Sequence, residues 1–267
     1  MKKLKIETRR GLRMAVGKRS FAGYSLNTCS YWVDGVIVDT GPRSLRAGFR
    51  AFLAAQPVEK VVLTHSHEDH CGNAVLFNEK GIPVYLHPGT VDRAAQPVRV
   101  PFYRWVFWRP RSPFKAEPLP GAIETARGKL IQVIPAPGHA PDHVAYLYPE
   151  EGVLFTGDLF VSTTTKLGMR EEDYAAWMNT LAKLLEYDFD LICCGHAGMV
   201  PNGKEMLAKK LHKLQELKES ILHLKEKGWS DREIERKLFP HTRKVELLSG
   251  GEWGSIHIVR ALMNTGK

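Results

Sequence analysis

The residues best suited to chemistry lie in one short segment, Thr64-His65-Ser66-His67-Glu68-Asp69-His70. It places three imidazoles and the carboxylate of Asp69 within six residues, directly after the apolar run at residues 60–63, which is typical of a buried strand. Imidazole and carboxylate groups without thiolate favour a catalytic zinc site, because Cys-rich sets close the coordination sphere and leave no place for water. The segment therefore predicts a catalytic site for Zn²⁺, with Mn²⁺ or Fe also admissible.

Two metal ions need more ligands than one loop supplies, and three further donors follow predicted strands elsewhere in the chain. They are His139 after residues 130–134, Asp158 after residues 153–155 and His196 after residues 190–194. A glycine precedes each of the three, which lets the backbone turn sharply and bring the next side chain close to an ion. The residues thus predict seven metal ligands: His65, His67, Asp69, His70, His139, Asp158 and His196.

The elements that must position these side chains alternate between strand and helix. Residues 30–40 predict two short strands around a hairpin at Asp34-Gly35, since this dipeptide supplies the positive φ angles of a tight turn. Further strands are predicted at residues 60–63, 83–86, 130–134, 144–148, 153–155 and 190–194, with helices at 44–55, 73–80 and 172–186. Interleaved strands and helices indicate an α/β sandwich.

The C-terminal part has a different pattern. From Lys204 to Gly228, leucines and isoleucines recur at three- and four-residue spacing, which predicts one long amphipathic helix. A second helix should begin at Ser230, with Glu233 completing a capping box. We therefore expect a catalytic domain over residues 1–203 and a mostly helical segment over residues 204–267.

Residues 97–120 interrupt the alternation with aromatic side chains, arginines and prolines, which predicts an irregular excursion. One interpretation makes it a substrate lid on which Arg104, Arg109 and Arg111 pair with an anionic group. The other makes it a packing or dimer element, and the sequence leaves both open. Glu68 is expected to be solvated.

The order His-x-His-x-Asp-His, Gly-His, Gly-Asp, Gly-His resembles the metallo-β-lactamase superfamily of hydrolases over about residues 20–200. The resemblance implies an αββα sandwich with a helical C-terminal appendage. It further implies one metal ion on His65, His67 and His139. The second ion then lies on Asp69, His70 and His196, with Asp158 bridging both.

Such a pair of ions lowers the pKa of a shared water toward neutrality, and the resulting bridging hydroxide attacks a carbonyl carbon or a phosphorus. Asp69 is the candidate catalytic residue, since its carboxylate can accept and pass on a proton. Asp39 is expected to orient the ligand loop from outside the metal shell.

The substrate is predicted from finer similarities. The segment Gly157-Asp158-Leu159-Phe160-Val161 is similar to glyoxalase II-type thioesterases, which favours an ester or thioester substrate. Residues 229–234, after the long helix, resemble the β-lactamase-like protein 2 group, in which RNA cleavage occurs, so a metal-dependent phosphodiesterase or RNA endonuclease is the alternative. A lactonase is less favoured, because the tyrosine of that branch is Val161 here. A non-catalytic nucleic-acid-binding protein is also less favoured. The leucine spacing of the predicted long helix explains its charged residues as the face exposed to solvent.

Composition sets the remaining expectations. A net charge of +9 and a pI near 9.4 favour anionic partners such as phosphorylated or carboxylated molecules or nucleic acid, of which a small anionic substrate is preferred. The sequence shows no signal-peptide core and no membrane span, which predicts a cytoplasmic protein with four reduced cysteines. The physiological substrate, the identity of the metal and the oligomeric state, including a homo-oligomer, are left open by the sequence.

Overall fold

The computed structural model describes residues 4–240 and 242–263, and the chain divides into two compact units. The first unit consists of residues 1–136, 142–161 and 188–203, and the second of residues 137–141, 162–187 and 204–267. The predicted domain boundary between residues 203 and 204 stays a prediction. Each unit is described by itself.

A seven-stranded sheet of the first unit has the order β1-β2-β3-β4-β5-β6-β7. Its strands are β1 (Lys5–Arg9), β2 (Leu12–Phe21), β3 (Tyr24–Val33), β4 (Val36–Val38), β5 (Lys60–Val62), β6 (Val84–Leu86) and β7 (Glu117–Pro118). Pairing is antiparallel from β1 to β4 and parallel from β4 to β7. The predicted hairpin is confirmed, with φ angles of 44° at Asp34 and 82° at Gly35 between β3 and β4.

The second sheet of this unit has six strands in the order β14-β13-β11-β10-β9-β8. These are β8 (Ala122–Glu124), β9 (Leu130–Pro135), β10 (Val144–Tyr148), β11 (Val153–Gly157), β13 (Leu191–Cys194) and β14 (Gly198–Pro201). β11 and β13 run parallel, so their carboxyl ends, which carry Asp158 and His196, lie at the same edge of the sheet. The strands predicted to deliver these two residues are confirmed.

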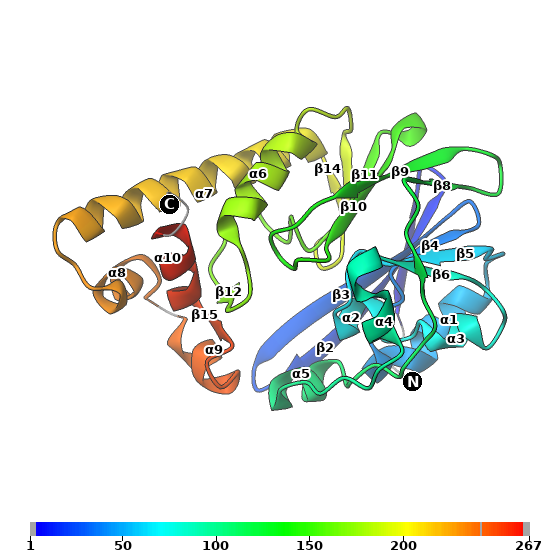
Figure 1. Cartoon of the computed structure of the whole chain (residues 1–267), viewed down its shortest axis with the longest axis horizontal. Helices are drawn as coiled ribbons and strands as arrows, with labels where there is room; N and C mark the ends of the chain where they lie inside the picture. The colour runs from blue at the N-terminus through cyan, green and yellow to red at the C-terminus, as the bar shows by residue number, and fades with distance from the viewer. Residues whose placement is uncertain (1–3, 241, 264–267) are drawn as a thin grey trace. The chain divides into compact units, whose positions relative to one another are not determined.

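The two sheets enclose the core of the first unit (Figure 1). Tyr31 of the first sheet packs edge-on against Phe155 of the second, and each is at most 2% exposed. Burial of an aromatic side chain of this kind contributes about 1.5–3 kcal/mol. On the other face of the first sheet, α1 (Arg46–Ala54) buries Phe49 and Phe52. Shorter helices complete this unit: α2 (Glu68–Cys71), α3 (Val75–Asn78), α4 (Val91–Ala94) and α5 (Phe102–Phe107).

The second unit is mainly helical. It contains β12 (Gly168–Met169), α6 (Tyr174–Leu184), α7 (Gly203–Glu226), α8 (Asp231–Leu238), α9 (Arg243–Leu248), β15 (Trp253–Gly254) and α10 (Ser255–Met263), with the first residue of α7 in the first unit. The predicted long helix is confirmed as α7, and the capping box of Ser230 and Glu233 begins α8 as expected. In the described part of the chain, no helix combines the length and apolar character needed to cross a bilayer.

Two expectations need correction, and two strands were not predicted. Residues 97–120 are not wholly irregular, because Phe102–Phe107 form α5. The helix expected over residues 73–80 is α-helical only at Val75–Asn78. β1 is mostly exposed and the buried residues of β2 lie only in its first six positions, so neither strand gives a long apolar run.

Candidate metal centre

The His-rich loop leaves β5 at Thr64 and is held there by Asp39. The backbone N–H of Thr64 donates to Oδ1 of Asp39 at 2.8 Å, and its hydroxyl donates to Oδ2 at 2.9 Å. Oδ2 also accepts from Nδ1 of His70 at 2.8 Å. Asp39 is 2% exposed and has a φ of 58°, which an aspartate tolerates better than most residues. The predicted role of Asp39 outside the metal shell agrees with these contacts, which leave Nε2 of His70 for a metal ion.

Four predicted ligands of the first unit converge in one cluster. One ligand atom from each of Asp69, His70, Asp158 and His196 lies within 4.8 Å of the others. Nε2 of His196 is 3.0 Å from Oδ2 of Asp158 and 3.5 Å from Oδ2 of Asp69. Nε2 of His70 is buried 3.2 Å from Oδ1 of Asp158, yet in a geometry that makes no hydrogen bond with any described residue. We call this set the four-donor cluster.

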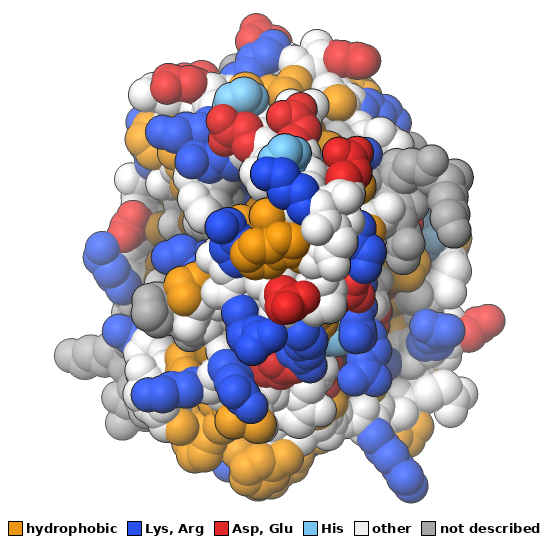
Figure 2. Space-filling view, turned by 90° about the vertical axis from the view of Figure 1, so that its left-hand side faces the viewer, with side chains coloured by type: hydrophobic (Ala, Val, Ile, Leu, Met, Phe, Trp, Pro, Cys, Tyr) orange, Lys and Arg blue, Asp and Glu red, His pale blue; other side chains and the backbone are white. Residues whose placement is uncertain are grey.

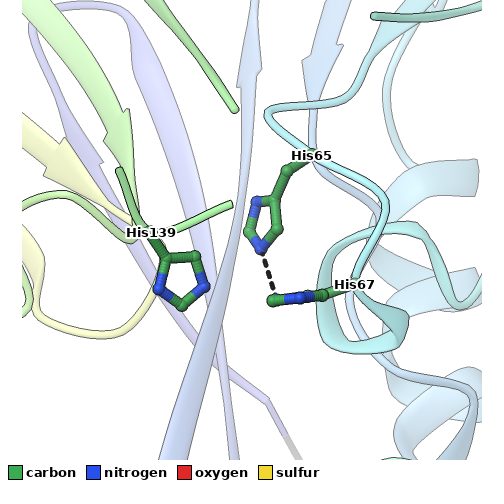
Figure 3. Close-up of side chains that lie close together, drawn as sticks. All are labelled: His65, His67 and His139. Carbon is green, nitrogen blue, oxygen red and sulfur yellow. Dashed lines mark hydrogen bonds between the residues drawn. The ribbon is translucent and has the colours of Figure 1, made fainter. Parts of the chain in front are cut away.

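Of the remaining three predicted ligands, His65 and His67 lie together in the first unit and His139 belongs to the second unit (Figure 3). Nε2 of His65 and Nδ1 of His67 are 3.0 Å apart. His65 is fully buried and its Nδ1 lies 3.1 Å from the Thr64 hydroxyl, so Nε2 is the nitrogen that faces its neighbours. The first unit therefore holds six of the seven residues singled out in the sequence, in the four-donor cluster and the pair of His65 and His67, and the second unit holds His139.

Burial and charge act against each other on these groups. Burial lowers the pKa of His196, but the Asp158 carboxylate outweighs it and raises this pKa to about 9. Burial likewise lowers the pKa of His70, and Asp158 and Asp39 raise it well above its usual range. For Asp158, burial raises the pKa, but His196 and His70 lower it further than burial raises it. His65 has its pKa lowered by burial and by the neighbouring histidines, so it is a neutral imidazole able to bind a metal ion.

A glycine at position 195 is required by the close packing of this cluster. A Cβ there would lie 2.5 Å from Cε1 of His70 and 2.7 Å from Oδ1 of Asp158. Any side chain would therefore push the donor atoms apart, so Gly195 is needed here for space rather than for the sharp turn that was expected.

The expectation for Glu68 was wrong. Its side chain is 3% exposed and accepts two hydrogen bonds from Arg104 of α5, each at 2.6 Å. Arg104 is therefore engaged within the protein rather than offered to a substrate, and the pair fixes the turn between His67 and Asp69. The sequence did not predict this ion pair, because Arg104 and Glu68 lie 36 positions apart. Arg104 also stands in a segment without regular spacing, so no pattern indicated its partner.

Two further residues near the ligands lacked a sequence signal. Glu172 accepts a hydrogen bond from Nδ1 of His139 at 3.0 Å, which no motif spacing indicated. His143 is not among the clustered donor residues of the described part of the chain. Instead, its Nε2 accepts the backbone N–H of Asp158 at 3.2 Å and supports that residue.

The donor set fits a pair of divalent transition-metal ions. It consists of imidazole nitrogens and carboxylate oxygens, the combination used by catalytic centres that retain a position for water. Five of its seven members are buried, and its two carboxylates need positive charge beside them. The two His/Asp clusters are thus consistent with a dinuclear metal site.

Comparison with protein families identifies the class. Residues 28–196 match the model of the metallo-beta-lactamase superfamily, which covers more than half of the chain and includes both donor groups. The chain belongs to this superfamily, as its sequence motifs indicated, and the predicted α/β fold with C-terminal helices is confirmed.

Individual relatives are distant. The chain is 25% identical over 202 residues to "Beta-lactamase-like protein 2 homolog" of Caenorhabditis elegans, covering 72% of this chain and 62% of the relative. It is 24% identical over 210 residues to "Atrochrysone carboxyl ACP thioesterase" of Aspergillus fumigatus, covering 77% and 61%. A metallo-beta-lactamase family protein from Thermus thermophilus has the same fold, with a TM-score of 0.68 at 22% identity, covering 96% and 92%. The chain spans about three fifths of the length of these two curated relatives.

Proposed function

We propose that this chain is a hydrolase that uses two Zn²⁺ ions to cleave an ester or thioester of a small anionic molecule. The observation that carries the proposal is the four-donor cluster, in which two carboxylates and two imidazoles of the first unit direct ligand atoms at one another within 4.8 Å. We assign the second ion to His65, His67 and His139, as the order of the sequence motifs implies. All seven ligands lie in residues 1–203, to which we assign the chemistry, and none in residues 204–267.

Two divalent ions at this site would lower the pKa of water and polarise the substrate oxygen. The chain's own residues hold and move the proton. Asp69 is the proposed catalytic residue, because its Oδ2 faces the cluster 3.5 Å from Nε2 of His196 and 3.9 Å from Nε2 of His70. Oδ2 of Asp69 accepts the proton of the attacking water and returns it to the leaving group. Asp39 keeps His70 in the orientation that its ligand role requires.

A groove beside the cluster supports a small-molecule substrate. It has a volume of about 800 Å³, and His196, Val16, Lys18 and Met199 are among its lining residues. This volume is within the range of small-molecule sites, about 300–1,000 Å³. The apolar side chains suit an acyl group, and the Lys18 ammonium suits a negative charge on the substrate. The similarity to a carrier-protein thioesterase favours a thioester over other acyl compounds.

The alternative is a phosphodiesterase or RNA endonuclease, since the same two-metal chemistry applies at phosphorus. Two observations support this alternative. One is the similarity to a β-lactamase-like protein 2 homolog. The other is the Lys and Arg side chains that gather in the lower half of the face in Figure 2. Binding to phosphates through such charges weakens steeply with salt.

The experiment is a substrate panel with the zinc-loaded full chain. It compares an aliphatic thioester, an aryl ester, an acyl-homoserine lactone, a phosphodiester and single-stranded RNA at low and physiological salt. We expect the thioester or the ester to be hydrolysed fastest, and the lactone to be slow because Val161 offers no hydroxyl. Faster turnover of RNA or of the phosphodiester, lost in Asp69→Asn, would replace the proposal with the alternative.

A further inference from the structure

His139 stands on a short segment of the second unit that α6 and the turn before it hold in place. The carbonyl of Gly138 accepts the backbone N–H of Asp173 at 2.8 Å, and the carbonyl of Pro137 accepts the hydroxyl of Thr180 at 2.7 Å. The backbone on which His139 stands is therefore fixed on both sides of Gly138. What remains to be fixed is the rotation of the imidazole ring and the choice of the nitrogen that carries its proton.

Glu172 determines both. Its Oε1 lies 3.0 Å from Nδ1 of His139, and the two side chains are only 6% and 8% exposed. A carboxylate only accepts hydrogen bonds, so Nδ1 must carry the hydrogen and a neutral ring keeps its lone pair on Nε2. Nε2 is then the nitrogen of His139 that can bind a metal ion.

The carboxylate of Glu172 is itself locked. Oε2 accepts the backbone N–H of Met169 at 3.1 Å and the hydroxyl of Tyr174 at 3.0 Å, and Tyr174 is 1% exposed. Because Oε2 has two donors of its own, Oε1 stays directed at the imidazole. An ion pair held by one flexible side chain would not restrict the ring in this way.

The C-terminal segment holds the turn that carries Glu172. Strand β12 pairs with β15, with Gly168 opposite Gly254 and Met169 opposite Trp253. The backbone N–H of Arg170 donates to the carbonyl of Glu252 at 3.2 Å. The donor that fixes Oε2, the N–H of Met169, thus belongs to a residue paired with the C-terminal segment.

A second connection reaches the ring from α7. The indole of Trp177 meets the imidazole of His139 edge-on, with 5.9 Å between ring centroids. Nζ of Lys210, which is 2% exposed, lies 5.1 Å from the centroid of the same indole. The imidazole therefore has a fixed carboxylate at Nδ1 and a fixed aromatic ring beside it.

We propose that Glu172 is a positioning residue that sets the proton and the orientation of His139 for metal binding, and that residues 252–254 of the C-terminal segment hold Glu172 in place. The inference rests on the proposed function in one respect, namely that His139 binds a metal ion. On this inference the C-terminal segment supports a metal ligand, although the segment itself supplies none. Carboxylates hydrogen-bonded to metal-binding histidines commonly change metal affinity about 10–100-fold.

The first test is zinc titration of Glu172→Gln against a chromophoric chelator. A glutamine has nearly the same shape but presents both an acceptor and a donor, so it no longer dictates which nitrogen of His139 is protonated. We expect one of the two zinc ions to bind about 10–100-fold more weakly and the other to bind as in the wild type. Glu171→Gln, which alters the exposed neighbouring carboxylate, is the matched control and should bind both ions normally.

The outcomes separate the two proposals. A wild-type protein that binds no zinc removes the proposed function and the inference together. A wild type that binds two ions, with Glu172→Gln binding both equally well, removes the inference alone.

A second measurement does not depend on the folding of a variant. Long-range ¹H–¹⁵N spectra of the imidazoles in the zinc-loaded wild type should show His139 with its hydrogen on Nδ1 and the metal on Nε2. A hydrogen on Nε2 of His139 would overturn the inference even if every variant failed to fold.

Discussion

Two regions of the chain bury polar and ionisable side chains, and they differ in what those side chains face. In the second unit, Glu235 is 6% exposed, yet both of its oxygens have donors. Oε2 accepts from Arg232 and Oε1 accepts from the hydroxyl of Ser255, each at 2.7 Å. Arg232 is also paired with Glu246 at 2.9 Å. We call these four side chains the C-terminal network, and its charges and hydrogen bonds are satisfied within the protein.

The four-donor cluster of the first unit is the opposite case. Its carboxylates and imidazoles turn their remaining ligand atoms toward one another, and the buried Nε2 of His70 makes no hydrogen bond with a described residue. Buried polar groups are normally satisfied, so a group that is not satisfied calls for an explanation, such as an ion. The comparison teaches that burial of charge alone does not mark a functional site. The direction of the unused donor atoms does.

The largest effect is expected from His67→Ala. It removes a metal ligand from the His-rich loop, and losing several kcal/mol of transition-state stabilisation lowers kcat/KM on the preferred ester on the order of 10³-fold. The melting temperature in the presence of chelator should change little, because this imidazole is partly exposed and lies outside both cores. Elemental analysis and ester hydrolysis measure the effect, and His212→Ala, a histidine that is 70% exposed on α7, is the control. Full activity in His67→Ala would show that this residue has no part in the chemistry.

Removing the metal tests, without a mutation, whether the four-donor cluster depends on bound ions. At a zinc concentration of about 100 times the dissociation constant, binding adds roughly 2.7 kcal/mol to the stability of the folded state. Chelation should therefore lower Tm by roughly 5–10 °C for a chain of this size. Differential scanning calorimetry with and without chelator measures the shift. An unchanged Tm would mean that the cluster is satisfied without ions, like the C-terminal network.

The pH dependence of the metal-free protein follows from the same cluster. The folded-state pKa of His196 is raised from 6.5 to about 9 by Asp158, so its pairing stabilises the metal-free protein fully below pH 6.5. This stability is lost as the pH rises from 6.5 through about 9. Zinc binding has the opposite dependence, because the ligands must lose their protons. The difference in Tm between zinc-loaded and chelated protein should thus widen over this range, and a constant difference would contradict the assignment of His196.

A smaller effect is expected from Asp39→Asn, which changes a residue behind the cluster. The amide side chain would keep one acceptor for Thr64 but no longer provide the charge beside Nδ1 of His70. Changes of this kind lower metal affinity about 10–100-fold. Zinc titration measures it, with Asp92→Asn on the exposed side of α4 as the control. An unchanged affinity would reduce Asp39 to a purely structural residue.

The sequence singled out the residues of the four-donor cluster but not the residues that support the predicted ligands, for a physical reason. The ligands stand at the ends of strands, and a buried strand has an apolar run that can be recognised locally, as at residues 60–63 and 153–155. The partner of a ligand depends on tertiary packing. Glu172 and Arg104 carry no local pattern, and they reach His139 and Glu68 from 33 and 36 positions away.

The same contrast applies to the fold. The hairpin at Asp34-Gly35 and the capping box at Ser230 were predicted because turn and cap geometry depend on a few neighbouring residues. The pairing of β12 with β15 was not, since each strand has two residues and their partners are more than 80 positions apart. The C-terminal network was not predicted either, because Arg232, Glu235 and Glu246 also fit the pattern of a helix face exposed to solvent.

The smallest expected effect comes from the C-terminal network itself. Glu235→Gln keeps the shape of the side chain but replaces the carboxylate with an amide, so Arg232 meets at best a neutral acceptor and the Ser255 hydroxyl must turn to accept from the amide N–H. Losing such a charge-assisted contact costs about 1–2 kcal/mol of unfolding free energy. Because the groups of this network are satisfied by one another, the loss of unfolding free energy should appear in urea unfolding while the zinc stoichiometry stays as in the wild type. The control, Glu219→Gln on α7, should change neither quantity. If Glu235→Gln released zinc, the two regions would be coupled, and the distinction between a satisfied network and a metal-binding cluster would no longer separate structure from function in this chain.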